Sequence, residues 1–261
     1  MISKIDILKA LEPYKCAVGK PVMVHTSLKA IGEIEGGGEV LLSALIEFFT
    51  QNGGLLCIPT HTWDKELLDL REKHTCLGVL PSLALERTDA VRTMHPTHSM
   101  AVFGDSDRVS AFIEGEESVD TPTSPNGCYG RLYSEDGYIL LIGVGQEKNT
   151  FLHCVEEMLS VPKRLTCDKQ DFKIIHKDGK CEIREMYWFY TDEIEDVSEN
   201  FGKFEAAFDF HNAITYGRIG NAKVQLCSAK KMKETIELIY NRNDFKELLA
   251  DKDPLDEKLY K

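Results

Sequence analysis

The fold class of this chain is decided by residues 21–63, which read PVMVHTSLKAIGEIEGGGEVLLSALIEFFTQNGGLLCIPTHTW. An apolar run opens this stretch and ends in polar residues at 25–27, which is typical of a buried strand. Residues 36–54 begin and end on glycines and carry apolar residues at helical spacing in between. A second apolar run, 54–63, again ends in polar residues. A strand, a helix and a strand in this order predict an α/β fold.

The remaining elements follow from the same kind of pattern. Further strands are predicted at 99–104, 137–145 and 218–229, and further helices at 1–16, 149–160 and 229–249. The first helix is expected to be amphipathic, with Ile5, Leu8, Ala10 and Leu11 on one side. The helix at 149–160 is expected to be capped by Asn149 or Thr150.

The second half of the chain shows a different residue pattern. Two β-rich runs within 171–192 flank Asp178-Gly179, a typical hairpin turn. A largely parallel first half is therefore expected to precede an antiparallel second half. We predict one α/β domain over residues 1–261, with a mixed sheet, flanking helices and a β-hairpin-rich insertion at 165–200.

Composition narrows the function classes. The chain has 261 residues, of which 43% are hydrophobic and 28% charged, enough to bury a sizeable core. Its net charge of -12 argues against nucleic acid and anionic membranes as partners and fits a cationic substrate, although solubility alone could explain it. The longest apolar runs are too short to predict a membrane span. Eight cysteines without CxxC pairs predict reduced, buried thiols and a cytoplasmic protein.

The end of the first predicted strand is one candidate site. His25, Thr26 and Ser27 lie at its carboxyl end, where open α/β sheets commonly bind ligands. Glycines 36–38 then open a helix whose free N–H groups suit a phosphate. A plain strand–turn–helix connection would show the same pattern. The stretch matches neither GxxxxGK[ST] nor GxGxxG, which counts against an NTPase or a dinucleotide enzyme.

Two further stretches, 92–104 and 121–133, carry polar side chains in predicted loops. His95 and His98 could bind a metal, but a third ligand at suitable spacing is missing. The alternative is that one histidine packs and satisfies backbone groups while the other lines a cleft. In 121–133, Ser124 lies in a loop rich in proline and glycine, where it could donate to a phosphate or simply hold the loop.

The most suggestive residue is His153, in the first turn of the predicted helix at 149–160. The positive end of a helix disfavours imidazolium, so His153 is expected to be neutral and able to take a proton. Glu156 and Glu157 follow three and four residues later, so either carboxylate could lie beside the imidazole. A surface helix with solvated charges would have the same spacing.

Taken together and in this order, these stretches resemble the aminoglycoside 3-N-acetyltransferase family. The resemblance runs from about residue 20 to 160 and resumes at 218–232. It rests on the blocks HTSLKAIG, GLLCIPTHTW, RTMHPTHSMAVFG, TSPNGCYGRLY and NTFLHCVEE. Two departures are Arg92-Thr93, where the family often has Arg-Ser, and Cys154-Val155, where it has Leu-Ala. Residues 64–90 and 165–200, which would shape the acceptor site, match poorly.

The resemblance implies the family's own α/β fold and an acetyl-CoA-dependent transfer to a primary amine, with the 3-amino group of an aminoglycoside as the first candidate. It implies no metal and no covalent enzyme intermediate. His153 would be the base and Glu156 its support. The groove for coenzyme A would be lined by Thr26, Ser27, Leu28, Ile31, Gly36, Gly37, His98, Ser99 and Ser124. Acidic side chains at Asp64, Glu156, Glu157 and Asp209 would bind other ammonium groups of the acceptor.

Three alternatives remain at this stage. The chain could acylate another small amine metabolite, or bind coenzyme A without catalysis. It could also be a hydrolase that uses Ser27 or Ser99, although the GxSxG elbow is missing. The sequence leaves the oligomeric state open, a homodimer included.

Overall fold

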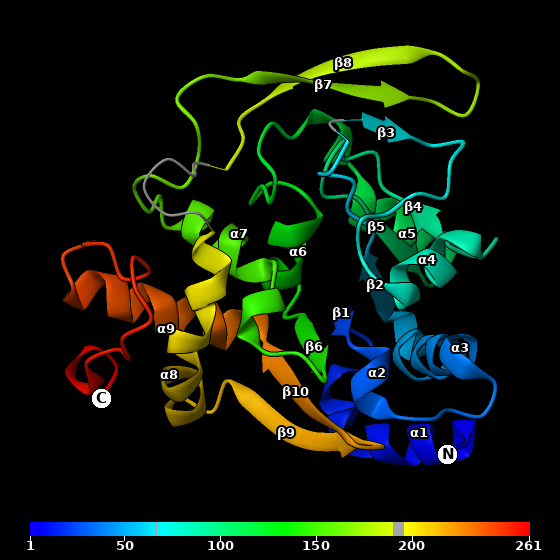
Figure 1. Cartoon of the computed structure of the whole chain (residues 1–261), viewed down its shortest axis with the longest axis horizontal. Coiled ribbons are helices and arrows are strands. Elements are labelled where there is room, and N and C mark those ends of the chain that lie inside the picture. Colours follow the sequence, from blue (N-terminus) through cyan, green and yellow to red (C-terminus); the bar gives the residue numbers. More distant parts are fainter. Residues whose placement is uncertain (66, 190–195) are drawn as a thin grey trace.

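The computed structural model describes residues 1–65, 67–189 and 196–261. Its centre is a seven-stranded mixed sheet with strand order β4-β5-β2-β1-β6-β10-β9 (Figure 1). The strands are β1 Pro21–Thr26, β2 Leu55–Pro59, β4 Val91–Arg92, β5 Met100–Phe103, β6 Tyr138–Ile142, β9 Ile214–Ile219 and β10 Ala222–Ser228. β1 pairs in parallel with β2 and β6, whereas the outer pairs on both sides are antiparallel.

Helices cover both faces of this sheet. Alternate residues of a strand point to opposite faces, so buried strands contribute apolar side chains to a core on each face. In β1, Val22 and Val24 join one core and Met23 joins the other. The first core also takes residues from α1 Lys4–Leu11, α3 Gly37–Phe49 and α4 Val79–Glu86. The second takes residues from α5 Ser106–Ile113, α6 Cys128–Ser134, α7 Phe151–Met158, α8 Glu205–Phe210 and α9 Ala229–Arg242. The short α2, Leu28–Ile31, follows β1.

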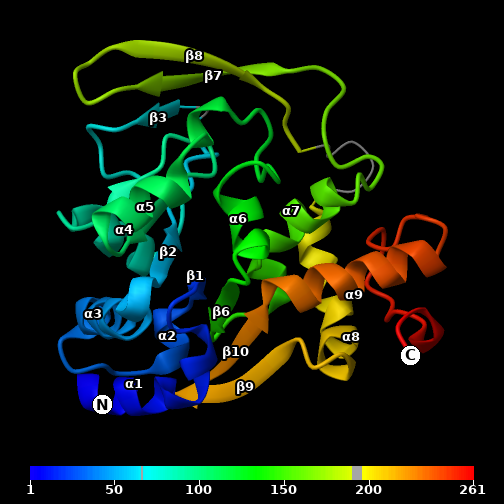
Figure 2. The same cartoon turned by 180° about the vertical axis from the view of Figure 1, so that it is seen from behind.

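A smaller sheet of three strands lies at the end of the molecule opposite α1 (Figures 1 and 2). β7 Gln170–Ile175 and β8 Cys181–Met186 form a hairpin, and β3 Leu67–Asp69 pairs in parallel with β7. Gly179 has a φ of 86°, which glycine adopts without strain, so the turn falls where Asp178-Gly179 predicts it. The predicted hairpin is confirmed.

The α/β class, the mixed sheet and the flanking helices are confirmed. The strands predicted at both ends of 21–63 are β1 and β2, and the helix between them is α3, which begins after Gly36 in a left-handed conformation. The chain leaves this helix through Asn52 and Gly53, both with positive φ.

Three predicted details are wrong. In α1 the buried side chains are Ile7 and Leu11, four residues apart, while Ile5 is 64% exposed. The strand predicted at 218–229 is confirmed as β10, but it begins only at Ala222, and residues 218–219 instead end β9, a strand that was not predicted. The first half is less parallel than expected, because β5 runs antiparallel to β2.

Within the described ranges, no helix combines the length and the apolar character that crossing a membrane requires.

Candidate active site

The candidate site lies where the parallel strands end. β1, β2 and β6 run in the same direction, so their carboxyl ends share one edge of the sheet. β1 delivers His25 and Thr26 there, and Thr60 and His61 follow β2 directly. β6 leads through a short turn into α7, which carries His153.

Two side chains at the end of β1 have unused hydrogen-bonding capacity. The hydroxyl of Thr26 and Nε2 of His25 are buried, and neither has a hydrogen-bond partner among the described residues. A buried polar atom without a partner is costly, so such atoms often mark a place that a ligand or water fills. Ser27 begins α2 without a side-chain cap, which leaves its hydroxyl available as well.

The glycines that open α3 lie next to the residues after β1. A Cβ atom on Gly38 would lie 2.9 Å from Cδ1 of Leu28, so the side chain of Leu28 packs closely against the start of α3 because residue 38 has no side chain. Gly36 and Gly37 both have positive φ and lie exposed at the start of α3. Ile31, by contrast, is 2% exposed and packs in the core, so its predicted place in the coenzyme A groove has no exposed surface to support it.

Two histidine rings are in contact at the same edge. The ring centroids of His61 and His98 are 4.4 Å apart, and Nε2 of His61 lies 2.9 Å from the Tyr129 hydroxyl. Burial is the main reason why the pKa of both histidines lies well below the usual range. These rings are therefore neutral hydrogen-bonding groups at neutral pH.

His95 has a structural role that explains the His-x-x-His pair without a metal. Its Nδ1 accepts hydrogen bonds from the backbone N–H groups of Thr97 and His98, and its Nε2 donates to the carbonyl of Thr121 at 3.0 Å. Both ring nitrogens are thus occupied, as expected for a histidine that satisfies backbone groups. No group of three or more His, Cys, Asp and Glu side chains suited to a metal occurs in the described part of the chain.

Ser99 is fully buried, and its hydroxyl is engaged within the protein. It donates to the carbonyl of Thr60 at 2.9 Å and lies within 3.2 Å of the Arg92 guanidinium. The hydroxyl of Ser124 instead accepts from the backbone N–H of Asn126 at 3.2 Å. A contact of either serine with coenzyme A stays a prediction.

His153 is the third residue of α7 and is held by aromatic rings. Its imidazole lies 4.5 Å from the ring of Phe189 and 4.8 Å from that of Phe201, measured between centroids. Burial lowers the pKa of His153 to about 4, although nearby Asp196 opposes the shift and Arg164 adds to it. The ring is therefore neutral at pH 7, as predicted. The main cause is desolvation of the buried ring, whereas the prediction rested on the positive end of the helix.

Neither glutamate of α7 forms a hydrogen bond or an ion pair with this imidazole in the described structure, so the support of His153 by Glu156 stays a prediction. One oxygen of Glu156 accepts from Arg164 at 2.8 Å and from the Tyr240 hydroxyl at 3.0 Å, and the other is buried without a described partner. Glu157 accepts from the Thr121 hydroxyl at 2.5 Å and from the backbone N–H and hydroxyl of Thr123. Buried carboxylates need hydrogen-bond donors, and these two find them in Arg164, Tyr240 and the threonines of the 121–123 loop.

A cavity of about 450 Å³ brings several of the predicted residues together. Ser124, Glu156 and Glu157 all line it, so the loop after Thr121 and the end of α7 share one concave surface. Its remaining lining residues are Asp120, Thr121, Pro125, Asn126, Ser160, Val161, Lys163, Arg164 and Leu165.

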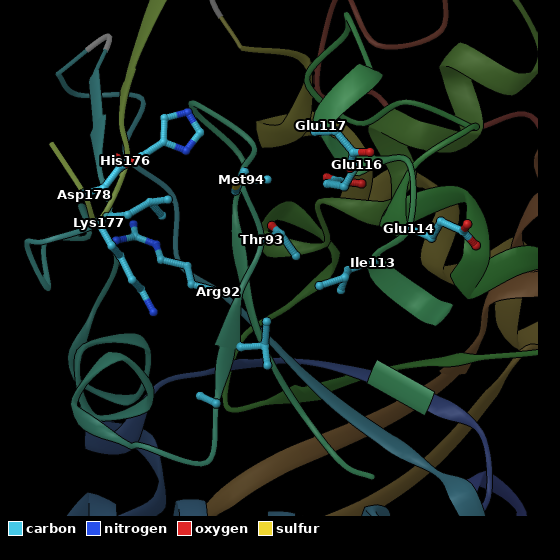
Figure 3. Close-up of a pocket in the computed structure, with 13 residues that line it drawn as sticks. Arg92, Thr93, Met94, Ile113, Glu114, Glu116, Glu117, His176, Lys177 and Asp178 are labelled. Atoms are coloured by element: carbon cyan, nitrogen blue, oxygen red, sulfur yellow. The ribbon is translucent and has the colours of Figure 1, made fainter. Parts of the chain in front are cut away.

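A second cavity, of about 630 Å³, lies apart from the predicted residues (Figure 3). The turn residues His176, Lys177 and Asp178 lie on one side of it, opposite Glu116 and Glu117. None of its lining residues was predicted to bind coenzyme A, the acceptor or the reacting proton.

The predicted acceptor residues Asp64 and Asp209 do not line the cavity that Glu156 and Glu157 share. Asp64 follows β2, and its carboxylate lies within hydrogen-bonding distance of His74, at 3.0 Å from Nε2. Asp209 is exposed on α8, where its close neighbour is Tyr216 of β9, so the structure does not bring it to this edge. Sequence reasoning missed His61, Trp188 and Phe189; the histidine lies in the quoted THTW block, but no local pattern marks the two aromatic residues.

A family model described as aminoglycoside 3-N-acetyltransferase matches residues 23–239 of this chain. The chain belongs to the aminoglycoside 3-N-acetyltransferase family. The predicted family is confirmed, and with it the kind of enzyme, an acyltransferase of this type. The match spans both predicted blocks of resemblance and the region between them.

Individual members of the aminoglycoside 3-N-acetyltransferase family are distant. The SPbeta prophage-derived aminoglycoside N(3')-acetyltransferase-like protein YokD of Bacillus subtilis is 22% identical, and the alignment covers 94% of this chain and 95% of that protein. Aminoglycoside N(3)-acetyltransferase VII of Streptomyces paromomycinus is 28% identical over 58% of each chain.

Solved structures of family members share the fold. Aminoglycoside acetyltransferase AAC(3)-Xa has a TM-score of 0.77 at 22% identity, covering 90% of this chain and 91% of that one. AAC-IIIb, solved as a binary complex with CoASH, has a TM-score of 0.76 at 17% identity, with 92% and 97% covered. At such identities the likeness establishes the architecture, and the site must be argued from its own residues.

Proposed function

We propose that this protein is an acetyl-CoA-dependent N-acetyltransferase whose acceptor is a primary amine, with the 3-amino group of an aminoglycoside as the expected target. The observation that carries the proposal is His153: a neutral imidazole at the carboxyl edge of the parallel strands, in a chain that matches the family over residues 23–239. A neutral imidazole is what a general base needs before it takes a proton.

The end of β1 is the place we propose for coenzyme A. The unpartnered hydroxyl of Thr26 and the uncapped hydroxyl of Ser27 can bond to amide or phosphate groups. Leu28 packs beside the glycines that open α3, where free N–H groups and the helix dipole favour a phosphate. A related structure, that of AAC-IIIb, contains CoASH, which supports the same assignment.

The proposed reaction transfers one proton from the amine to His153 and one acyl group from the thioester to the amine. His153 accepts a proton from the acceptor amine as the amine nitrogen attacks the thioester carbonyl. The tetrahedral intermediate collapses, the C–S bond breaks, and the thiolate of coenzyme A leaves with the former C–S electron pair. The amide product and imidazolium remain, and the proton then passes to the thiolate or to solvent. In this scheme no metal and no covalent enzyme intermediate is required.

A cationic acceptor fits the charge of the protein. The chain carries a net charge of -12, which raises the local concentration of a polycation such as an aminoglycoside. Relatives of the same fold are solved with a gentamicin and with sisomicin. We assign the acceptor ammonium groups to the side of Asp64, since the carboxylate of Glu157 already accepts three hydrogen bonds within the protein and Asp209 lies elsewhere.

We also propose a cytoplasmic location. All eight cysteines are free thiols, which suits a reducing compartment that also holds acetyl-CoA.

A thiol-release assay tests the proposed function. The protein is supplied with acetyl-CoA and a panel of aminoglycosides, simple polyamines and neutral amino sugars, with acceptor-free and His153→Gln reactions as controls. Release with an aminoglycoside, and NMR of a product acetylated at the 3-amino group, is the expected result. Turnover confined to other amines would point to a different small amine metabolite. Binding of coenzyme A without any turnover would replace catalysis by a binding role.

A further inference from the structure

The imidazole of His153 has no side-chain hydrogen bond to any described residue, although general bases are commonly oriented by one. Something else must fix its direction, because a catalytic group that rotates freely loses much of its effect. The two glutamates on its own helix are engaged with Arg164 and with the threonines of the 121–123 loop. The groups that do contact the imidazole are rings.

Phe189 covers one face of the imidazole. The two ring planes are inclined by 32° with centroids 4.5 Å apart, so the rings make a close, tilted contact. Phe201, from the turn of 3-10 helix Val197–Phe204, meets the same imidazole at 65°, edge to face. One ring thus lies over the imidazole and another meets it at an angle.

The backbone around Phe189 is fixed by its neighbours. Residue 189 forms a β-bridge with Leu165, and the adjacent Trp188 exchanges hydrogen bonds with Thr166 at 2.8 and 3.0 Å. The ring of Phe189 also meets His98 edge to face, at 5.3 Å. It therefore stands between the two histidines that face the end of the sheet.

We propose that Phe189 is a positioning residue for acyl transfer, which orients the imidazole of His153 and keeps water away from it. This inference deepens the proposed function and rests on it for its catalytic meaning. Among the residues that the structure describes, the charged and titratable groups around His153 are Asp196 at the start of the 3-10 helix, Arg164 after α7, and His61 and His98 at the sheet edge. Of these groups Asp196 favours the imidazolium, so loss of the apolar cover would let solvent and Asp196 together stabilise the charged ring.

The test measures the His153 titration directly, by NMR of the imidazole in the protein without substrates, with His153→Gln to assign the signal. The parent protein is expected to titrate near the low value that burial imposes, about 4. Phe189→Ala should raise the pKa of His153 by at least about one unit toward the reference value near 6.5. Phe189→Leu, which keeps an apolar cover, should leave it low. If the alanine variant fails to fold, Phe189→Thr keeps more volume and should shift the titration in the same direction.

Phe172→Ala is the matched control. Phe172 packs on Trp188 at 5.5 Å and makes no ring contact with a histidine in the described structure, so its loss loosens the same region without uncovering His153. In Phe172→Ala, His153 should titrate at the same pH as in the parent protein. A titration unchanged in Phe189→Ala or Phe189→Thr, or shifted equally in Phe172→Ala, would overturn the proposal.

Kinetics separate this inference from the proposed function. In an active enzyme, Phe189→Ala should lower kcat by roughly tenfold to a hundredfold, since misplacement of a catalytic group by about 1 Å costs up to about 10²-fold. The acid limb of its pH–rate profile should move upward together with the NMR titration, and the KM for acetyl-CoA should change little. If the NMR shift occurs but no amine is acetylated by the parent, the positioning of His153 stands and the acetyltransferase assignment fails.

Discussion

At the scale of single residues, Glu157 shows that a glutamate four residues after a histidine on a helix can hold a loop in place as well as face the imidazole. Its position four residues after His153 suggested a carboxylate for an ammonium group or for the imidazole. The structure instead has it accept three hydrogen bonds from Thr121 and Thr123, so that it fastens the loop of Ser124 to α7. Burial raises the pKa of this carboxyl, and the threonine donors partly offset that effect.

Replacement of Glu157 should therefore cost stability. Glu157→Gln keeps the size of the side chain but loses one acceptor oxygen, so a donor in the loop loses its partner. We expect the free energy of unfolding in urea to fall by about 1–3 kcal/mol, the usual cost of a buried unsatisfied group. Glu117→Gln, an exposed glutamate on the nearby turn, should change it little. Equal stability of the two variants, with a raised KM for the amine in Glu157→Gln alone, would restore the acceptor role.

The histidines give the protein a characteristic response to acid. Burial lowers the pKa of His25, His95 and His153 to about 4, so the folded protein binds fewer protons than the unfolded chain between pH 4 and 6.5. Folding stability must then rise with pH across that window and fall as acid is added. Glu156 opposes this trend, because burial raises its pKa to about 7 and its folded form holds a proton that the unfolded chain releases.

His61 and His98 add to the effect of these three histidines, since burial lowers their pKa as well, whereas Glu116 and Glu157 act with Glu156, since burial raises theirs. Five histidines outweigh three glutamates, so a net loss of stability is predicted on acidification. Urea unfolding at pH 7, 6 and 5 should give a decreasing free energy at constant ionic strength. Glu156→Gln should make the loss on acidification steeper, since it removes one of the opposing groups. A free energy that is constant or increases as the pH falls would mean that these histidines titrate normally in the folded protein.

At the scale of elements, α7 is held in place by an ion-pair network that joins distant parts of the chain. Arg164 bonds Glu156 and, at 2.7 and 3.0 Å, Glu247, while Tyr240 of α9 donates to Glu156. Arg164 and Glu156 are 5% and 1% exposed, so neither charge can be left alone without a large cost. The network fixes the helix on which His153 stands.

Removal of the arginine tests this role. Arg164→Met should lower the free energy of unfolding by about 3–5 kcal/mol, because it leaves a buried carboxylate unpaired. Arg108→Met breaks a more exposed pair with Glu135 and should cost at most about 1 kcal/mol. The double variant Arg164→Met, Glu156→Leu should recover part of the loss in thermal or urea unfolding. Similar losses for Arg164→Met and Arg108→Met would refute the network.

The elements differ in how far the sequence could predict them. β1, α3 and β2 were predictable because their apolar residues repeat with a clear period and glycines bound the helix. β9 was not, since Ile214–Ile219 alternates polar residues and a glycine on an edge strand, and only its pairing with β10 makes it a strand. The face of α1 was misjudged because burial of Ile7 depends on the packing of α1 against α3.

At the scale of the whole molecule, the site could be located but its internal contacts could not be predicted. The parallel order of β2, β1 and β6 brings His61, Thr26 and His153 to one edge, and this follows from strand–helix alternation. The partners of Glu156 and His153 come from residues 164, 189, 201 and 240, which no local spacing connects to α7. Such contacts depend on how the hairpin, the 3-10 helix and α9 pack, and therefore on the complete fold.

The measurement that tests the account most directly is the turnover of His153→Gln with acetyl-CoA and an aminoglycoside that the parent protein acetylates. Glutamine retains size and polarity but cannot accept the proton, so kcat should fall by about 100- to 10,000-fold while coenzyme A still binds. The parent rate should stay insensitive to protonation of this residue down to about pH 4, where His153 takes up its proton. A folded His153→Gln protein with near-normal turnover would contradict the account, and His98 would then be the next base to examine.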